Sequence, residues 1–469
     1  MNQMHAAQTT IDVTGALAAE IVALANRGLT GHDIEQVRRL LLDHFGVAQR
    51  GSALPWTREL ARWARRFAGT GAAPVLGTDY SATACMAALV HGTAAHGYEL
   101  DDTHDATMSH PGCCVIPAVL AVGAELGASQ THVLLAIAAG YEAMGRAGMM
   151  SNALHMLEGG FHPTAVLGSF GAATGAAVLY GLHAGDLRPE VVVRAWGHAL
   201  SQTGGTMQFS VEPDGGNVKR IHAGYAARNG VMAAEFAQLD IATPSHAIEG
   251  RYGLCRMFSF GDADPNALTR KGDEPLQIHC ISMKPYSCCR IFHSTIDAFG
   301  EVTDNFTLPA DQIERIVVKG PQVIEDQHMM RRPQSVMAAQ YSCPYMLGAS
   351  MAYGPSFYTA YSAPYFNDSR ILEIVDRVEF EYDQELETYY PARFPTGVTM
   401  TLKDGTVRSS VVMDSFGTPV RPLSPEQIGE KAKALLSEIS SGIDLARVRS
   451  MIWDDATGAR ALAEVVAGR

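Results

Sequence analysis

The sequence predicts a mainly α-helical protein, in which a large all-helical domain built from both ends of the chain carries a smaller α+β lid domain. Three observations lead to this prediction. Apolar residues recur at helical spacing almost without interruption from about residue 11 to residue 256. Strand and hairpin patterns begin only after about residue 261, and a strong helix start returns at residue 424. At 469 residues, the chain is long enough for two or more domains.

The first helices are recognised by their apolar spacing and their end signals. Asp33 is a candidate cap for a helix whose apolar face includes Val37, Leu40 and Phe45, and this helix ends near Gly51. Further apolar helices are predicted over residues 82–96, 115–126, 132–149, 166–182 and 191–202. Because the inner helices are apolar on most sides, they are expected to pack against one another in one all-helical domain.

One segment resembles a membrane helix in composition. Residues 159–185 contain no Asp, Glu, Lys or Arg. The segment is nevertheless rich in Gly and Ala at four-residue spacing, which lets helices approach closely in soluble cores as well as in bilayers. His162-Pro163 interrupts it, and the sequence has no second such span. We therefore predict a buried helix of a soluble protein that does not contact a membrane.

The α+β unit begins with a predicted strand at residues 276–283 and a helix at 289–302. A strand at 313–319, helices at 335–352 and 368–375, and a hairpin of strands 398–402 and 408–414 around Asp404-Gly405 follow. Ser424-Pro425-Glu426-Gln427 then matches a capping box with Pro at the first helical position. These limits predict an all-helical domain over residues 1–275 and 416–469 and a lid over residues 276–415.

Composition limits the class of partner. Hydrophobic residues make up 47 % of the chain and charged residues only 18 %, which excludes a wholly disordered protein. The 36 Lys and Arg against 49 Asp and Glu give a net charge of −13, which argues against a nucleic-acid binder or a protein with a basic membrane-binding surface. An anionic substrate must therefore be held by a local cluster of Lys, Arg and His.

Cysteine usage and the first residues indicate the compartment. The eight Cys include no C-x-x-C pair and are too few for a disulfide framework in a chain of this length. Residues 1–10 lack the basic and apolar pattern of a secretory signal. We therefore expect a cytoplasmic protein.

A cluster of histidines and carboxylates is the first candidate site, and it comprises His91, His96, Glu99, Asp101, Asp102, His104, Asp105 and His110. Imidazole and carboxylate are common metal ligands, but the spacing contains neither H-x-x-x-H nor H-E-x-x-H, so we expect no metal. In the alternative interpretation, His91 and His96 are ordinary helix residues, and Asp101 and Asp102 cap the next segment. Capping and function both remain open for these two Asp residues.

Two further segments combine glycine or basic residues with histidine. His162 follows Gly159-Gly160 and precedes an uncharged helix, whose unpaired N–H groups favour an anionic group. Lys219 and His222 lie three residues apart and would share one helical face. A capped helix and a solvated basic patch are the respective alternatives.

The last segment places Lys284 at the end of a predicted strand, with Cys289 and His293 at the start of the following helix. A Cys at a helix start can have a lowered pKa and act as a nucleophile. The favoured interpretation is a small buried thiol beside a ligand, since free Cys is usually a small apolar residue.

Together these segments resemble the MmgE/PrpD family. The matching blocks are HGTAAHGYELDDTH at 91–104, SHPG at 109–112, GFHPT at 160–164, KRIHAG at 219–224, KPYSCC at 284–289 and QY at 340–341. The family includes 2-methylcitrate dehydratase, cis-aconitate decarboxylase and iminodisuccinate epimerase. The resemblance implies a helical domain built from both chain ends, a lid, a homodimer, and an active site at the domain junction without metal or organic cofactor.

The resemblance also implies the roles of individual residues. The catalytic set would be Asp102, His110, His162, Lys219, Lys284 and Tyr341. The substrate-binding set would be Glu99, Asp101, Thr103, His104, His222, Cys289 and His293. Two positions depart from the better-known members, since Glu99 stands where they have Asp and Cys289 stands where the decarboxylase has His.

The favoured function is a cofactor-independent lyase that dehydrates a small citrate-like di- or tricarboxylic acid. Lys219, Lys284 and the histidines would hold the substrate carboxylates, and His110 or His162 would move the proton next to one of them. An epimerase or isomerase of a dicarboxylate is the first alternative, and a cis-aconitate-type decarboxylase is the second. A metal-dependent hydrolase and a non-catalytic helical protein are the alternatives outside this class.

Overall fold

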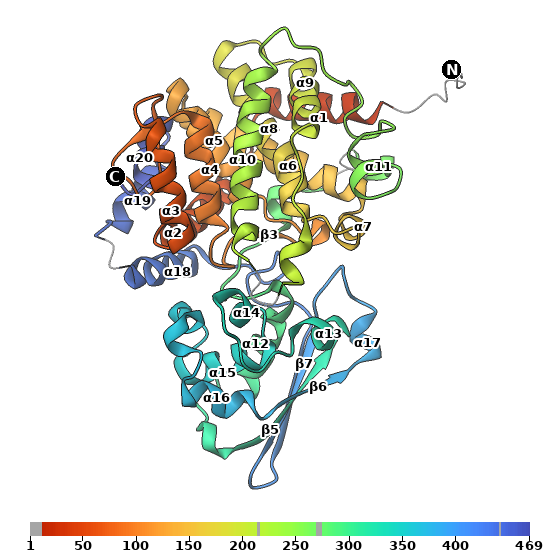
Figure 1. The fold of residues 1–469 in the computed structure, drawn as a ribbon, viewed down its shortest axis with the longest axis vertical. Coiled ribbons are helices and arrows are strands. Elements are labelled where there is room, and N and C mark those ends of the chain that lie inside the picture. Colours follow the sequence, from red (N-terminus) through yellow and green to blue (C-terminus); the bar gives the residue numbers. More distant parts are fainter. Residues whose placement is uncertain (1–11, 213–215, 269–273, 440–441) are drawn as a thin grey trace.

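The structure, a computed structural model, describes residues 12–212, 216–268, 274–439 and 442–469, so the predicted absence of a secretory signal in residues 1–10 lies outside it. Figure 1 shows two lobes, with helices from both chain ends in one and the strands of the larger sheet in the other. We call the first lobe the helical unit and the second the α+β unit. This architecture confirms the predicted mainly α fold with a smaller α+β region.

In the part of residues 12–258 that the structure describes, the helical unit begins with eleven α-helices. They are α1 (Val13–Arg27), α2 (Gly31–Ser52), α3 (Pro55–Ala64), α4 (Ala84–Ala95), α5 (Gly112–Leu126), α6 (Gln130–Ser151), α7 (Ala153–Glu158), α8 (Pro163–Ala184), α9 (Pro189–Leu200), α10 (Val218–Phe236) and α11 (Leu254–Phe258). The chain returns to this unit with α18 (Pro425–Glu438), α19 (Leu445–Trp453) and α20 (Ala459–Val466). Short strands β1 (Ala73–Pro74) and β2 (Ser81–Ala82) pair with each other, so the unit is not purely helical.

The starts of two helices can be compared directly with the caps that the sequence predicts. The predicted capping box of α18 is present, because Ser424 Oγ accepts from the N–H of Gln427 and Gln427 Oε1 accepts from the N–H of Ser424. The predicted cap of α2 was wrong by three residues. Thr30 is the cap, and Asp33 is the third helical residue, whose carboxylate accepts the N–H of Thr30.

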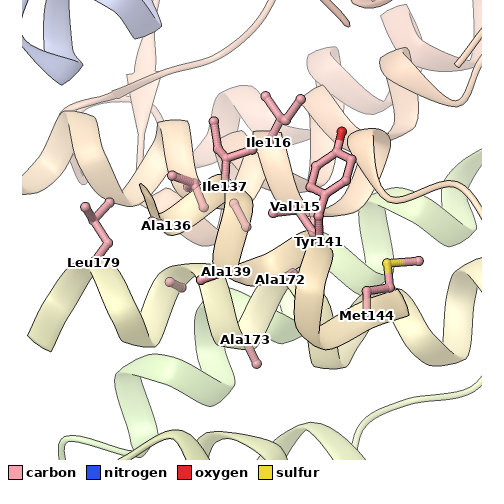
Figure 2. Close-up of a cluster of buried hydrophobic side chains, with 14 of the residues drawn as sticks. Val115, Ile116, Ala136, Ile137, Ala139, Tyr141, Met144, Ala172, Ala173 and Leu179 are labelled. Atoms are coloured by element: carbon pink, nitrogen blue, oxygen red, sulfur yellow. The ribbon is translucent and has the colours of Figure 1, made fainter. Parts of the chain in front are cut away.

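The centre of the helical unit is close-packed because small residues let its helices approach. Figure 2 shows side chains of α5, α6 and α8 meeting there, among them Val115, Met144 and Ala172. A Cβ atom added at Gly140 of α6 would lie 2.5 Å from Cγ1 of Val115 and 2.8 Å from the carbonyl oxygen of Gly171 in α8. Only glycine at position 140 permits this approach.

Among the described residues, α8 is the helix that is long and apolar enough to cross a membrane. In the structure 89 % of its most apolar 18-residue window is buried against the rest of the protein. It packs against α6, α5 and α10, as expected for the predicted core helix.

The α+β unit contains a four-stranded sheet and several helices. Its elements are α12 (His293–Val302), β5 (Ile313–Gly320), α13 (Val323–His328), α14 (Val336–Gln340), α15 (Cys343–Tyr353), α16 (Ser369–Val375), β6 (Val378–Tyr382), α17 (Gln384–Glu387), β7 (Thr396–Leu402) and β8 (Val407–Val412). The strand order is β6-β5-β7-β8, with β5 and β6 parallel and the other pairs antiparallel. The predicted hairpin is β7–β8, and the predicted strand at 313–319 is β5.

Three predicted elements of this unit differ in the structure. Residues 276–283 form a 3₁₀-helix at Gln277–Cys280 and only the two-residue strand β4 (Ile281–Ser282), and the N–H of Gln277 donates to Glu142 Oε2 at 2.7 Å. The helix predicted at 289–302 begins only at His293. The helix predicted at 335–352 is divided into α14 and α15, because Pro344 supplies no N–H and Ser342 caps a new helix.

Most apolar side chains of the two units form two separate clusters, and a smaller cluster joins Tyr358 of the α+β unit to Tyr98 and Leu435 of the helical unit. One cluster runs from α1 to α11 and continues through α18, α19 and α20, and the other joins α12, α15, α16 and the four-stranded sheet. Leu276, Ile278, Ile281 and Met283 pack in the first cluster, although the predicted boundary assigns them to the lid. The predicted domain limits remain a prediction, although these four side chains pack with the helical unit and not with the predicted lid.

A short strand pair links the units at their junction. Strand β3 (Thr103–His104) follows α4 in the helical unit, and it pairs antiparallel with β4, with Thr103 opposite Ser282. This pairing brings the chain just after β4 beside the loop between α4 and β3. Lys284 on one side and Glu99 on the other are consequently neighbours in space.

Candidate active site

The candidate site lies at this junction, where segments of both units converge. The helical unit supplies the end of α4 with the following loop, and the first residues of α5, α8 and α10. The α+β unit supplies the loop after β4 and the end of α14. Helix ends dominate the site because their side chains point out of the packed bundle toward the other unit.

Glu99 is the centre of a buried ion cluster. Its Oε1 pairs with the ammonium of Lys219 and the guanidinium of Arg220, and its Oε2 accepts from Lys284 Nζ at 3.4 Å. None of these four side chains is more than 4 % exposed. Glu99 has a φ of +55°, a left-handed conformation that costs a non-glycine residue roughly 1–2 kcal/mol. Its three cationic partners hold the carboxylate despite this strain.

The charges of the ion cluster determine its ionisation. Burial opposes ionisation of Glu99, but Lys219, Arg220 and Lys284 hold its pKa well below the usual range. Burial lowers the pKa of Lys219. Burial acts the same way on Lys284, but Glu99 and Asp101 outweigh it and raise the pKa of that ammonium. Three basic side chains thus surround one glutamate, which leaves an excess of positive charge in a water-poor environment.

Lys284 is the least satisfied member of the ion cluster. Over the described part of the chain, its ammonium makes one hydrogen bond, the 3.4 Å contact with Glu99. An ammonium carries three donors, and a buried charge without partners is costly. The side chain is therefore poised to bind an anionic group.

Four imidazoles form the second part of the site. The ring centroid of His96 lies 5.1 Å from that of His110 and 5.6 Å from that of His162, and the rings of His162 and His222 are 5.3 Å apart. Burial lowers the pKa of each, to about 3 for His110 and about 4 for His222. Neutral imidazoles at neutral pH can accept a proton.

Carbonyl and carboxylate oxygens orient two of these rings. Asp101 Oδ2 lies 2.6 Å from Nδ1 of His96 and 3.6 Å from Nδ1 of His110. His110 Nδ1 donates to the carbonyl oxygen of Asp102 at 2.8 Å, and Thr103 Oγ1 lies 3.3 Å from the same nitrogen. In both rings Nδ1 is thus the protonated nitrogen and Nε2 carries the lone pair.

Tyr341 and Gln340 complete the site from the α+β unit. Lys219 Nζ donates to Tyr341 Oη at 2.7 Å, and burial together with Glu99 raises the pKa of Tyr341 well above its usual value. Gln340 accepts from Arg220 at 3.0 Å and donates to the carbonyl oxygen of Tyr98 at 3.0 Å. The Gln340 amide therefore joins α10, the Glu99 loop and the α+β unit.

Comparison with known proteins identifies the family of this site. A family model of the MmgE/PrpD N-terminal domain matches residues 15–266, and a model of the MmgE/PrpD C-terminal domain matches residues 286–452. The chain belongs to the MmgE/PrpD family. The sequence-based prediction of the family is thereby confirmed.

Several MmgE/PrpD relatives align along nearly the whole chain. The cis-aconitate decarboxylase of Mus musculus is 26 % identical over 445 residues, which cover 91 % of this chain and 87 % of that protein. The cis-aconitate decarboxylase-like protein oryM of Aspergillus oryzae is 25 % identical over 472 residues, 96 % of this chain and 95 % of oryM. The cis-aconitate decarboxylase of Aspergillus terreus is 25 % identical over 451 residues, 91 % of this chain and 89 % of the relative. These MmgE/PrpD relatives support a lyase-type family.

Most of the predicted MmgE/PrpD site residues meet at the junction. Those in the ion cluster, in the imidazole group or in contact with them are Glu99, Asp101, Thr103, His110, His162, Lys219, His222, Lys284 and Tyr341. Their roles remain predictions.

Asp102 lies next to this group but faces the helix behind it. Its carboxylate accepts the N–H of Gly112, the first residue of α5, at 2.8 Å, and the hydroxyl of Tyr141 at 2.6 Å. Burial raises the pKa of Asp102 to about 7. These contacts favour the capping interpretation over the catalytic one.

Among the described residues, three other predicted residues make no hydrogen bond to the ion cluster or the four imidazoles, although the charges of Glu99, Lys284 and Lys219 act on the thiol of Cys289. His104 contacts Gln277 at 2.7 Å and Thr107 at 3.0 Å, because its strand turns the ring into the helical unit. His293 packs against the ring of Tyr286. The backbone N–H of Cys289 donates to Gln340, and burial raises the pKa of its thiol, which favours the neutral-thiol interpretation over a nucleophile.

Three residues of the candidate site were given no catalytic or substrate-binding role from the sequence. They are Arg220, Gln340 and His96, which lie within the matched blocks, and His96 was considered only as a possible metal ligand or an ordinary helix residue. Arg220 follows Lys219 directly, and a second basic residue there was the available signal. No sequence feature predicted that His96 would contact Asp101, because that contact depends on the turn that follows α4.

Two groups within the described ranges bring possible metal ligands within 4.8 Å of one another. They are His96, Asp101 and Cys113, which are buried, and Asp12, His246 and Glu249 near the surface. Cys113 Sγ donates to the carbonyl oxygen of His110 at 3.1 Å, and burial raises its pKa well above the usual value.

Proposed function

We propose that this protein is a cofactor-independent lyase that dehydrates a small citrate-like di- or tricarboxylic acid. The proposal is carried by the ion cluster, in which Lys219, Arg220 and Lys284 surround Glu99 and Lys284 retains unused donors. A substrate carboxylate beside Lys284 would supply the missing acceptor and balance the excess positive charge.

The same cations would assist the chemistry. When a proton leaves the carbon next to a carboxylate, negative charge develops on the carboxylate oxygens. Lys284 and Lys219 are preorganised and buried, so they would stabilise that charge without reorganisation of water. Their contribution would be larger in the transition state than in the bound substrate.

Dehydration requires a base and an acid, and the site contains both kinds of group. His110 or His162 would take the proton from carbon as neutral imidazole. The electron pair of the broken C–H bond would form the new double bond while the C–O bond breaks. Tyr341, held by Lys219 at 2.7 Å, or a protonated imidazole would give its proton to the departing hydroxide, which leaves as water.

Decarboxylation is the second candidate, and it is favoured by the relatives named as cis-aconitate decarboxylases. In that reaction the C–C bond to one carboxylate breaks, carbon dioxide leaves, and an acid protonates the carbanion. An epimerase of a dicarboxylate is the third candidate, and it would need a base and an acid on opposite faces of one carbon.

Proton NMR of a panel of acids in deuterated water would distinguish these reactions. The panel contains citrate, cis-aconitate, malate and aspartate-derived dicarboxylates. Loss of water supports the dehydratase, and carbon dioxide release supports the decarboxylase. Deuterium at a stereocentre without either loss would remove the lyase proposal, and no turnover of any acid would remove the wider proposal.

A matched pair of variants tests the binding argument. Lys284→Met removes the under-satisfied ammonium, whereas Lys319→Met removes a partly exposed lysine paired with Glu381. In a thermal-shift assay with the turned-over acid, stabilisation is expected for the wild type and for Lys319→Met but not for Lys284→Met. Equal stabilisation of all three proteins would contradict the assignment of Lys284.

We also propose a cytoplasmic homodimer. Residues 211–260 carry several large apolar side chains that are exposed in the single chain, and these are Val211, Val218, Tyr225, Leu239, Ile241, Tyr252, Met257 and Phe260. A second copy would cover such residues, because large exposed apolar areas usually mark an interface. Light scattering that gives the mass of one chain would contradict the dimer.

A further inference from the structure

His96 has the environment of a base rather than of a packed core residue. It follows α4 directly, its side chain is fully buried, and its ring lies between those of His110 and His162. Asp101 Oδ2 lies 2.6 Å from Nδ1, which fixes the ring and places the proton on that nitrogen. Nε2 therefore presents its lone pair.

Within the described residues, this Nε2 atom is buried and has no hydrogen-bond partner. Such an atom needs an explanation, because a nitrogen that is buried without a partner loses its hydrogen bonds to water and gains none from the protein. A substrate hydrogen or an ordered water between the rings would supply the partner. The neighbouring Lys219 and Glu99 place this nitrogen close to where substrate carboxylates would bind.

Other buried histidines of the chain show what a packing role looks like. His44 and His91 satisfy each other through Nε2 atoms 2.9 Å apart. His104 uses both nitrogens, one toward Gln277 and one toward Thr107. His293 also leaves Nε2 unpaired, but no described carboxylate contacts its ring. His96 alone among these five residues combines a carboxylate at Nδ1 with a free Nε2.

We propose that His96 is the catalytic base of the site and that Asp101 is the residue that positions it. This assignment rests on the proposed function and deepens it, because it names the atom that accepts the substrate proton and puts His96 in the place of His110 or His162 as the base. The C–H bond breaks as an N–H bond forms at Nε2, and the electron pair forms the new double bond beside the carboxylate held by Lys284 while the C–O bond breaks and the hydroxide leaves as water with a proton from an acid of the site. His110 and His162 then serve as acids or carboxylate ligands.

The groups facing His96 agree with this role. Burial and the charge of Lys219 favour the neutral ring, whereas the charge of Asp101 opposes them, and the balance lowers the pKa of His96. Glu99, Cys113, His110 and His162 are the other titratable groups around it. A proton taken from substrate would in turn be stabilised by Asp101, whose pKa is held well below its usual range by His110 and His96 despite burial.

The test compares His96→Gln with His91→Gln, which changes a buried histidine within the preceding helix α4. Turnover and exchange of the substrate C–H with deuterated water are measured on the acid that the wild type converts. For His96→Gln we expect both rates to fall by about 10²–10⁴-fold with unchanged affinity for the acid, and for His91→Gln we expect little change in either rate. Retention of exchange by His96→Gln would overturn the proposal, whereas an inactive wild type would overturn the proposed function instead.

Two measurements guard against a merely structural effect. In ¹⁵N-histidine NMR of the wild type, His96 is expected with Nδ1 protonated and Nε2 unprotonated, and the opposite tautomer would contradict the assignment. Asp101→Asn is expected to lower kcat with little change in KM and to shift the pH profile, since it leaves the ring without its carboxylate. Stoichiometric metal in the wild type that is lost from His96→Gln would show a metal ligand in place of a base.

Discussion

The ammonium of Lys284 lies 3.4 Å from the carboxylate of Glu99, although the two residues are 185 positions apart in the chain. The contact exists because β3 and β4 pair across the junction of the two units. Glu99 comes shortly before one strand, and Lys284 comes shortly after the other. The charge balance of the site consequently depends on the docking of the two units.

Glu99→Gln removes the one carboxylate that pairs with Lys219, Arg220 and Lys284. Three buried cations would then face no carboxylate in direct contact, and the free energy of unfolding is expected to fall by about 3–5 kcal/mol. Added citrate or phosphate should recover part of this loss. Urea unfolding with and without the anion measures both effects. Glu379→Gln, in an exposed pair with Arg315, should cost no more than about 1 kcal/mol, and an equal loss in both variants would contradict this account.

Asp102 should make stability fall as the pH rises. Its pKa is about 7 in the folded protein, whereas the ordinary pKa of an Asp side chain is 3.8, so the folded state keeps a proton that the unfolded state has already released. The stabilisation is complete below about pH 4 and is lost as the pH rises toward 7. Relative to Asp102→Asn, the wild type should lose about 4 kcal/mol over this range. Urea unfolding curves of the two proteins that stay parallel from pH 4.5 to 8 would rule out this titration.

Buried imidazoles should make the protein sensitive to acid. Burial lowers the pKa of His91 and His110 to about 3 and that of His222 and His328 to about 4, whereas the ordinary pKa of histidine is 6.5. Their stabilisation is present above pH 6.5 and is lost as the pH falls, by about 1.4 kcal/mol per pH unit for each residue. Unfolding at pH 5 should therefore take up about four protons through these residues. Calorimetry in buffers of different ionisation enthalpy counts them, and an uptake near zero would refute the prediction.

Two Gly→Ala substitutions are expected to have opposite effects on the free energy of unfolding, because only one of the two glycines lies where α6 and α8 approach closely. Gly140→Ala places a methyl group against Val115 and the backbone of Gly171, and we expect a loss of about 1–3 kcal/mol or more. Gly429→Ala lies within α18 with no atom in the way, and we expect a gain of up to about 1 kcal/mol from helix propensity. Chemical denaturation measures both, and a neutral Gly140→Ala would show that the helices can move apart.

Patterns confined to a few neighbouring residues predicted the fold well. The capping box at Ser424 and the turn pair Asp404-Gly405 carry their own geometry, so α18 and the β7–β8 hairpin were expected correctly. Residues 276–283 were not, because their alternating apolar pattern faces the helical unit and their polar groups bond to side chains such as Glu142. The break between α14 and α15 was signalled by Ser342 and Pro344, and that signal was overlooked.

The sequence motifs predicted most of the residues that form the candidate site, but not which of those residues contact one another. Motif matching placed Glu99, Lys219, Lys284 and Tyr341 in one site, and the structure brings them into contact. It left capping and function both open for Asp102, since the contact of Asp102 with the start of α5 depends on the path of the chain between residues 102 and 112. Nor could it predict which nitrogen of each ring is free.

The return of the chain to the helical unit also orders events in time. Helices α18 and α19 pack on α2, and α20 packs on α5, so the core built by the early helices is completed only by residues that are synthesised after the α+β unit. The four-stranded sheet has all its strands by residue 412 and can form earlier. During synthesis the α+β unit could therefore fold while the early helices still expose apolar surface, and they would need shielding from aggregation until α18, α19 and α20 emerge.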